Sequence, residues 1–487
     1  MLYCRRMSGP DFDGAPLPPH APAVPPRPFF RPWVTWLSTV LVAGLVAQLY
    51  VLTPGGPLDH LQRPEDSLER LTEREMEVRA ALRHARPWER RLYTLLSGGD
   101  EGVDDWIGWH EELAQVSTSP DVELARLILL GETRQTEALG EALEEWEGDD
   151  SAVTRRKDWI AAAYLEPSLD RATGRALITE VRDELPSGWF ADALVARLAR
   201  RSGDAIARQQ AESAIAARGS ALLRRWRALE GAGLLMGVAG LAALGCLLLL
   251  HVDLRLADAR MPDGFSLSDG YALFIRGALG FLVVGAVLGL TLPLDSKLDS
   301  IMGPATIAPV LLYAVWYLRS RGVSFTAAFG LLPARGRLVT LAWVCLALIG
   351  LQLAGEALIG AALNALHVSS HWADGLQDDL IWGSWRVVAR EAIDSSLWAP
   401  FGEEVAFRGV LYPALRTRFN VAPAAALSAA LFAVAHGYGV TGFAAVFWSG
   451  VIWAVAYERT GSLWPSIVAH GVGNFAATAE IVALLRI

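Results

Sequence analysis

Three short segments near the C-terminal end of the chain place ionisable side chains inside apolar stretches. The first, APFGEEVAFRG, holds the adjacent glutamates Glu403 and Glu404, followed by Arg408. Adjacent residues on an α-helix point about 100° apart, so both carboxylates can face the interior of a helical bundle. Ionisable groups are costly inside a membrane, and each of them therefore needs a partner or a chemical purpose.

Glu404 precedes Arg408 by four residues, which is the spacing and the order of a favourable intrahelical ion pair. This pair would neutralise the carboxylate of Glu404 and leave Glu403 without an ion-pair partner. A carboxylate in low-dielectric surroundings binds a proton more readily than in water, and a general base near neutral pH needs this property. The spacing therefore predicts Glu403 as the base and gives Glu404 and Arg408 a structural role.

The other two segments supply histidines. His436 ends the run LFAVAH, and IVAHGVGN places His470 and Asn474 four residues apart on one helical face. At about 1.5 Å per residue, Glu403, His436 and His470 lie at similar depths from the ends of their segments. Three helices can thus bring together a base, a second group that holds water, and donors for an oxyanion.

The three segments match three motifs in order: EExxxR in EEVAFR, FxxxH at Phe432 and His436, and HxxxN at His470 and Asn474. Together they resemble the CPBP family of intramembrane glutamic endopeptidases, which includes the type II CAAX prenyl endopeptidases and bacterial Abi-type proteins. The resemblance covers residues 338–487.

This resemblance implies a role for each matching residue. Glu403 resembles the base that activates water, and His436 resembles its partner in holding that water. His470 and Asn474 resemble the pair that stabilises the tetrahedral oxyanion. The chain is accordingly expected to be a CAAX-protease-like intramembrane endopeptidase of the glutamic type, with no cofactor and no metal. Three further carboxylates in apolar segments belong to no motif and are expected to be packing or cavity residues: Glu356, Glu391 and Glu480.

Two alternative functions stay open. Two histidines and a glutamate can hold zinc as a His₂Glu site, with Asn474 behind them. The sequence has no HExxH, and His367 and His371 have the four-residue spacing but no glutamate between them. The second alternative is a non-catalytic membrane scaffold or immunity protein that retains the fold.

The elements that must position these residues are apolar segments long enough to cross a membrane. Hydrophobic residues make up 53% of the 487 residues, yet charged residues still reach 20%, so a membrane bundle joined to a soluble part is expected. Apolar length predicts about nine spans, at residues 33–52, 231–251, 277–292, 301–318, 338–363, 387–412, 422–436, 442–457 and 462–485.

The predicted fold is an all-α, polytopic transmembrane helical bundle with a soluble α-helical domain inserted after the first span. Five parts follow along the chain: a proline-rich cytoplasmic tail (1–32), a membrane anchor (33–52), an extracytoplasmic helical domain (53–228), additional spans (229–337) and the protease-like core (338–487). Dense charges and apolar residues at three- and four-residue spacing indicate amphipathic helices in 53–228.

Arginines set the expected orientation. Arg27 and Arg31 precede the first span and acidic residues follow it, so the positive-inside rule places the N-terminus in the cytoplasm and 53–228 outside. Lysine is rare relative to arginine, as in GC-rich genomes, and we expect a multi-pass protein of a cell membrane, the bacterial inner membrane.

Charge and setting also define the expected partners. The net charge of −9 provides no basic surface for nucleic acid. The expected substrate is a membrane-embedded or membrane-proximal peptide in the lipid bilayer, and the 53–228 domain is expected to bind a protein partner.

Overall fold

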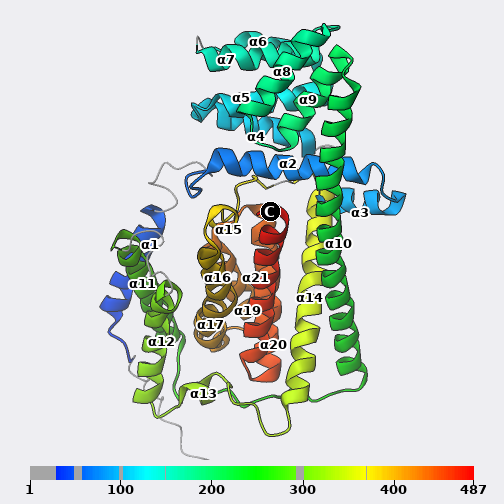
Figure 1. Ribbon diagram of the computed structural model, residues 1–487. Coiled ribbons are helices and arrows are strands. Elements are labelled where there is room, and N and C mark those ends of the chain that lie inside the picture. Colours follow the sequence, from blue (N-terminus) through cyan, green and yellow to red (C-terminus); the bar gives the residue numbers. More distant parts are fainter. Residues whose placement is uncertain are drawn as a thin grey trace, which may run out of the picture.

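The computed structural model describes residues 29–48, 58–97, 102–147, 150–291, 301–368 and 370–486. Within these ranges the regular secondary structure is entirely helical, as expected for the all-α class. Figure 1 shows an upright bundle of long helices with a smaller group of helices stacked on one end. The predicted tail lies outside the described residues, apart from its last four.

The smaller group, called the head domain below, comprises residues 58–228. Its helices are α2 Pro64–Leu82, α3 Pro87–Ser97, α4 Gly102–Val116, α5 Pro120–Glu132, α6 Thr136–Glu145, α7 Ser151–Ile160, α8 Arg171–Glu184, α9 Trp189–Ser202 and the first half of α10, with a π-helical turn η3 at Ala161–Leu165. Apolar faces meet in a core in which Leu127, Trp159 and Leu194 are fully buried. Side-chain caps begin several of these helices, as where Asp170 accepts from the amides that open α8.

The head domain and the bundle share one helix. The helix α10, Ala205–Leu249, runs for 45 residues from the head domain down the full height of the bundle (Figure 1). The expected boundary at residue 228 therefore falls inside a continuous helix. Charged residues in its first half and apolar residues in its second half assign the two environments without any break in the backbone.

Five helices in the described part of the chain are long and apolar enough to cross a membrane: α10, α11 Leu267–Thr291, α14 Leu338–Ala365, α20 Val440–Thr460 and α21 Trp464–Leu485. The chain is therefore a multi-pass membrane protein, but the count of nine spans is not confirmed. Two of the other predicted spans form apolar helices of only 16 residues, α1 Pro32–Ala47 and α19 Val421–His436. A third predicted span forms α12 Met302–Ser320, which is not among the five helices that are long and apolar enough to cross a membrane. The fourth, residues 387–412, is divided into several helical pieces.

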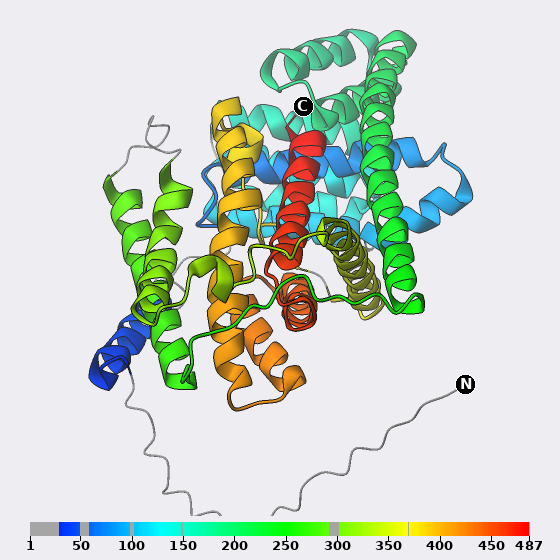
Figure 2. The same ribbon diagram turned by 90° about the horizontal axis from the view of Figure 1, so that it is seen from below.

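The bundle surrounds the motif-bearing helices. In Figure 1, α1, α11 and α12 stand on one side and α10 and α14 on the other, with the helices from α16 to α21 between them; Figure 2 shows the same arrangement end-on. The short helix α13, Phe325–Ala328, lies at the end opposite the head domain. The predicted tail contributes to this packing, since Phe29 and Phe30 lie against Tyr317.

The head domain is packed directly onto the bundle. Helix α2 lies across the end where α21 terminates (Figure 1). Leu61 and Leu68 join Trp372 and Leu485 in one buried cluster. At the same junction Asp378 Oδ2 accepts hydrogen bonds from the backbone amides of Gln62 and Arg63, at 2.7 and 2.8 Å.

Candidate active site

The two glutamates lie on a helix that is interrupted on both sides. Residues 385–416 form α16 Trp385–Ile393, η5 Asp394–Trp398, α17 Ala399–Glu404, η6 Val405–Leu411 and α18 Tyr412–Arg416, in which the η segments are π-helical. Glu403 and Glu404 close the short α17, between the two π-helical segments. π-Helical insertions are rare and often occur at functional positions, because they shift the direction of the side chains that follow.

The buried ion pair has the geometry expected from its spacing. Arg408 and Glu404 are both 0% exposed, and Arg408 Nη1 donates to Glu404 Oε1 at 2.8 Å. The guanidinium also lies over the rings of Phe432 and Trp453, 4.2 and 5.0 Å from their centroids, which partly replaces its hydration. Gly450 makes this position possible, because a Cβ there would lie 2.9 Å from Arg408 Nη2.

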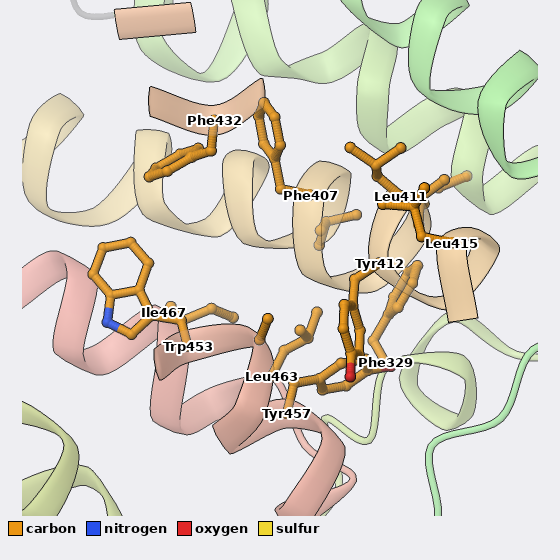
Figure 3. Packing of buried hydrophobic residues seen from close by; sticks show 14 of the residues in the cluster. Phe329, Phe407, Leu411, Tyr412, Leu415, Phe432, Trp453, Tyr457, Leu463 and Ile467 are labelled. Atoms are coloured by element: carbon orange, nitrogen blue, oxygen red, sulfur yellow. The ribbon is translucent and has the colours of Figure 1, made fainter. Parts of the chain in front are cut away.

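His470 joins the two glutamates. Its Nδ1 donates to Glu404 Oε1 at 3.2 Å, since an ion-paired carboxylate can only accept, and its Nε2 lies 3.7 Å from Glu403 Oε2. The ring stacks on Trp453 with centroids 4.4 Å apart. Figure 3 shows Trp453 and Phe432 at one end of the buried apolar cluster, away from Tyr412 and Tyr457. Glu404 and Trp453 thus fix the orientation of the imidazole.

Glu403 is the carboxylate without a close partner. Its side chain is 32% exposed, whereas that of Glu404 is 0% exposed. Glu403 Oε2 is buried and has no hydrogen-bond partner among the residues that the structure describes. Its 3.7 Å separation from His470 Nε2 is longer than a hydrogen bond. This oxygen therefore has a free lone pair beside a fixed histidine.

His436 lies near this cluster without touching Glu403 through a hydrogen bond in the described part of the chain. It is the last residue of α19, which ends because Gly437 takes a left-handed conformation at φ 67°. Its Nδ1 donates to the Phe432 carbonyl at 2.8 Å, which leaves the Nε2 lone pair available. The Phe432 ring lies between the two histidines, 4.6 Å from His436 and 5.7 Å from His470.

Asn474 connects α21 to the π-helical segment η5. Its Nδ2 donates to the Ser395 carbonyl at 2.8 Å, which uses one of its two N–H bonds. Close approach of the two elements requires Gly471, since a Cβ there would lie 2.4 Å from the Ser396 carbonyl oxygen. The glycine next to His470 therefore lets α21 pack against the glutamate-bearing helix.

Sequence reasoning missed a polar bridge beside this site. Glu356 Oε1 accepts from Gln352 Nε2 and from Ser449 Oγ, both at 3.1 Å, and so connects α14 to α20. The Gln352 amide lies against Gly473 of α21. The signal in the sequence was Glu356, a carboxylate in an apolar helix. Its partner Ser449 is 93 residues away, and its partner Gln352 belongs to no motif. Trp453, one turn after Ser449, carried no sequence signal for its stacking on His470.

These observations define a class: a multi-pass helical membrane protein with a buried arginine–glutamate–histidine cluster. Residues 386–476 match the family model described as type II CAAX prenyl endopeptidase Rce1-like, which confirms the family resemblance and supports assignment as a protease. The matched range includes every predicted site residue. Comparisons with curated proteins and with solved structures gave no match. In the described part of the chain, no group of three or more His, Cys, Asp or Glu side chains is arranged to hold a metal ion.

Proposed function

We propose that this protein is an intramembrane endopeptidase of the glutamic type, in which Glu403 activates the attacking water. The observation that supports this most directly is the different surroundings of the two adjacent glutamates. Glu404 is fully buried and is paired through Oε1 with Arg408 and His470, whereas Glu403 is 32% exposed and makes no hydrogen bond within the described residues. A general base needs such a free oxygen within reach of water.

Charge balance assigns a proton to the cluster. Arg408 and Glu404 neutralise each other, so Glu403 and His470 remain as an ionisable pair. An unpaired charge is costly in these surroundings, so we place the proton on His470 Nε2, where the imidazolium offsets the charge of Glu403 across 3.7 Å. When water enters, Glu403 accepts its proton while His470, protonated on both nitrogens, stays oriented by Glu404.

The hydrolysis then follows from the donors in place. The water oxygen bonds to the carbonyl carbon, while His436 Nε2 accepts the remaining water hydrogen. His470 Nε2–H and the second N–H of Asn474 donate to the oxyanion. Glu403 returns its proton to the amide nitrogen as the C–N bond breaks. The second water proton passes to His436 Nε2, so the products are a carboxylate and an amine, and His436 releases that proton to water when they leave. This scheme keeps the role of each residue that the family resemblance implies.

The proposed substrate is a peptide in or next to the bilayer. The matching family is named for prenyl endopeptidases, so a prenylated C-terminal peptide is one candidate, and an unmodified membrane peptide is the other. The proposed location is the bacterial inner membrane, with the head domain outside the cytoplasm. In that arrangement the head domain can contact the parts of a substrate that leave the membrane.

The experiment is a cleavage assay in proteoliposomes with two quenched fluorescent peptides, one farnesylated at a CAAX terminus and one unmodified. Glu403→Gln should remove cleavage, with a loss of about 10² to 10⁴ in rate, because glutamine cannot accept a proton. His470→Ala and Asn474→Ala should each lose about 10² to 10³. Glu480→Gln makes the same chemical change at an exposed position of α21 and serves as the matched control.

Full activity in Glu403→Gln would end the glutamic mechanism. The zinc alternative is tested in the same preparation, since it predicts activity that is lost with a chelator and restored by zinc. If no peptide is cleaved and Glu403→Gln captures no substrate that the wild type releases, the scaffold alternative is favoured.

A further inference from the structure

A cleft with a volume of about 910 Å³ opens in the head domain, outside the family match. Ligand pockets in proteins typically measure about 300 to 1,000 Å³, so this cleft is large enough for a short peptide segment. Its walls come from α2, α3, α4, α5, α9 and α10. No part of the proposed hydrolysis uses it.

The cleft is basic in an otherwise acidic domain. Acidic residues outnumber basic ones between residues 53 and 228. The cleft nevertheless contains six arginines: Arg79, Arg83, Arg90, Arg134, Arg197 and Arg200. Its two carboxylates are already neutralised, because Glu132 pairs with Arg197 at 2.6 Å and Glu212 with Arg200 at 3.3 Å. Unbalanced positive charge therefore remains.

Three arginines carry this charge. Arg83, Arg90 and Arg134 are exposed at the cleft and make no ion pair or hydrogen bond through their side chains with any residue in the described ranges. Helix dipoles explain part of the arrangement, since Arg83 follows the C-terminus of α2 and Arg134 that of α5. They do not explain Arg90, which lies in the first turn of α3, where the dipole disfavours positive charge.

Arg134 adds a second observation. Its φ of 63° places it in the left-handed region, which is costly for a residue with a side chain and cheap for glycine. An arginine kept in such a backbone at the edge of a cleft indicates a use for its side chain. Arg134 thus has an unfavourable backbone conformation, and Arg90 has an unfavourable position relative to the dipole of α3.

The floor of the cleft is apolar. Leu129 is fully buried there, Trp189 and Ala193 are buried, and Met76 and Ile215 complete the surface. A basic rim over an apolar floor matches a ligand with carboxylates on one side and apolar groups on the other. Guanidinium groups bind carboxylates through paired N–H bonds, which adds direction to the charge attraction.

We propose that this cleft binds an acidic peptide segment with interspersed apolar side chains. The size of the cleft and its apolar floor favour a peptide over a free anion. Helix α3, which carries Arg90, packs against α14, so the site lies beside the bundle. Helix α10 forms one wall and continues into the bundle. The site is therefore placed to hold a segment next to the membrane.

The test uses the full-length protein in an uncharged detergent and fluorescent peptides of alternating Glu and Leu, with Gln/Leu and Lys/Leu peptides of equal length. The wild type should bind the Glu/Leu peptide, and affinity should fall by about tenfold for each arginine contact removed. The variant combines Arg83→Glu, Arg90→Glu and Arg134→Glu. Arg91→Glu is the matched control, because Arg91 is exposed on α3 next to Arg90 but does not line the cleft.

Arg134→Gly provides a second variant that removes one charge while relieving the backbone, so its loss of affinity cannot come from unfolding. Binding of the Gln/Leu peptide as tight as that of the Glu/Leu peptide would overturn the proposal. So would unchanged affinity in the triple variant or in Arg134→Gly. Arginine-dependent binding of phosphatidylglycerol vesicles without binding of the peptide would also overturn it, and would assign the cleft to lipid headgroups. Because binding is read without cleavage, these outcomes are independent of the Glu403 assay.

Discussion

Arg408→Ala should disrupt folding as well as activity, and the structure indicates by how much. Glu404 is 0% exposed and would be stranded as an unpaired carboxylate. Removing one partner of a buried ion pair typically costs about 3 to 5 kcal/mol. The contact with the Phe432 ring, at 4.2 Å, adds about 2 kcal/mol when desolvated. The total approaches the whole net stability of many proteins, about 5 to 15 kcal/mol.

The assay is the yield of monodisperse protein in detergent, followed by thermal unfolding, for Arg408→Ala and for two comparison variants. The double variant Glu404→Gln with Arg408→Met removes both charges, keeps the volume and leaves an acceptor for His470 Nδ1. Replacing both partners of a buried pair by neutral groups is often close to neutral in stability, so much of the folded yield should return. Arg408→Lys should recover less, because a compact ammonium cannot lie flat between the Phe432 and Trp453 rings.

Two results would refute this reasoning. If Arg408→Ala accumulated and melted like the wild type, the pair would have no structural role. If the double variant were as unstable as Arg408→Ala, the loss would come from the missing guanidinium packing and not from the stranded carboxylate.

Three further perturbations test other parts of the structure. Gly450→Ala should cost about 1 to 3 kcal/mol by overpacking against Arg408, while Gly245→Ala, in open space on α10, should be neutral or stabilising; equal melting shifts for the two would contradict the packing at Gly450. Asp378→Ala should loosen the head domain from the bundle by about 1.5 to 3 kcal/mol, because two backbone amides lose a charged acceptor, and limited proteolysis should then cut the junction faster than in the wild type. Burial lowers the pKa of His110 to about 3, whereas the unfolded value is about 6.5. Between pH 6.5 and pH 3 the unfolded chain therefore binds a proton that the folded chain does not, so the free energy of unfolding decreases as the pH is lowered. The variant His110→Gln should lose less stability than the wild type over this range in fluorescence-detected unfolding.

Much of the fold could be predicted because it depends on local composition. Apolar length identified the segments that became α14, α20 and α21, with bounds within a few residues. Amphipathic periodicity identified the head domain as helical. The predicted number of spans is not confirmed where apolar length alone does not define a helix. Helix α19 ends at His436 because Gly437 turns the backbone, and residues 387–412 contain π-helical insertions that no periodic pattern reveals.

The sequence by itself determined the helical membrane class, the ion pair of Glu404 with Arg408, and which polar side chains lie in apolar helices. These depend on neighbours within one or two turns. Only the tertiary structure decided that His470 lies between Glu403 and Glu404, that Trp453 stacks on it, and that six arginines from distant helices share one cleft. Such contacts join residues far apart in the chain. They depend on how helices pack, where a single glycine such as Gly471 sets the approach of two backbones.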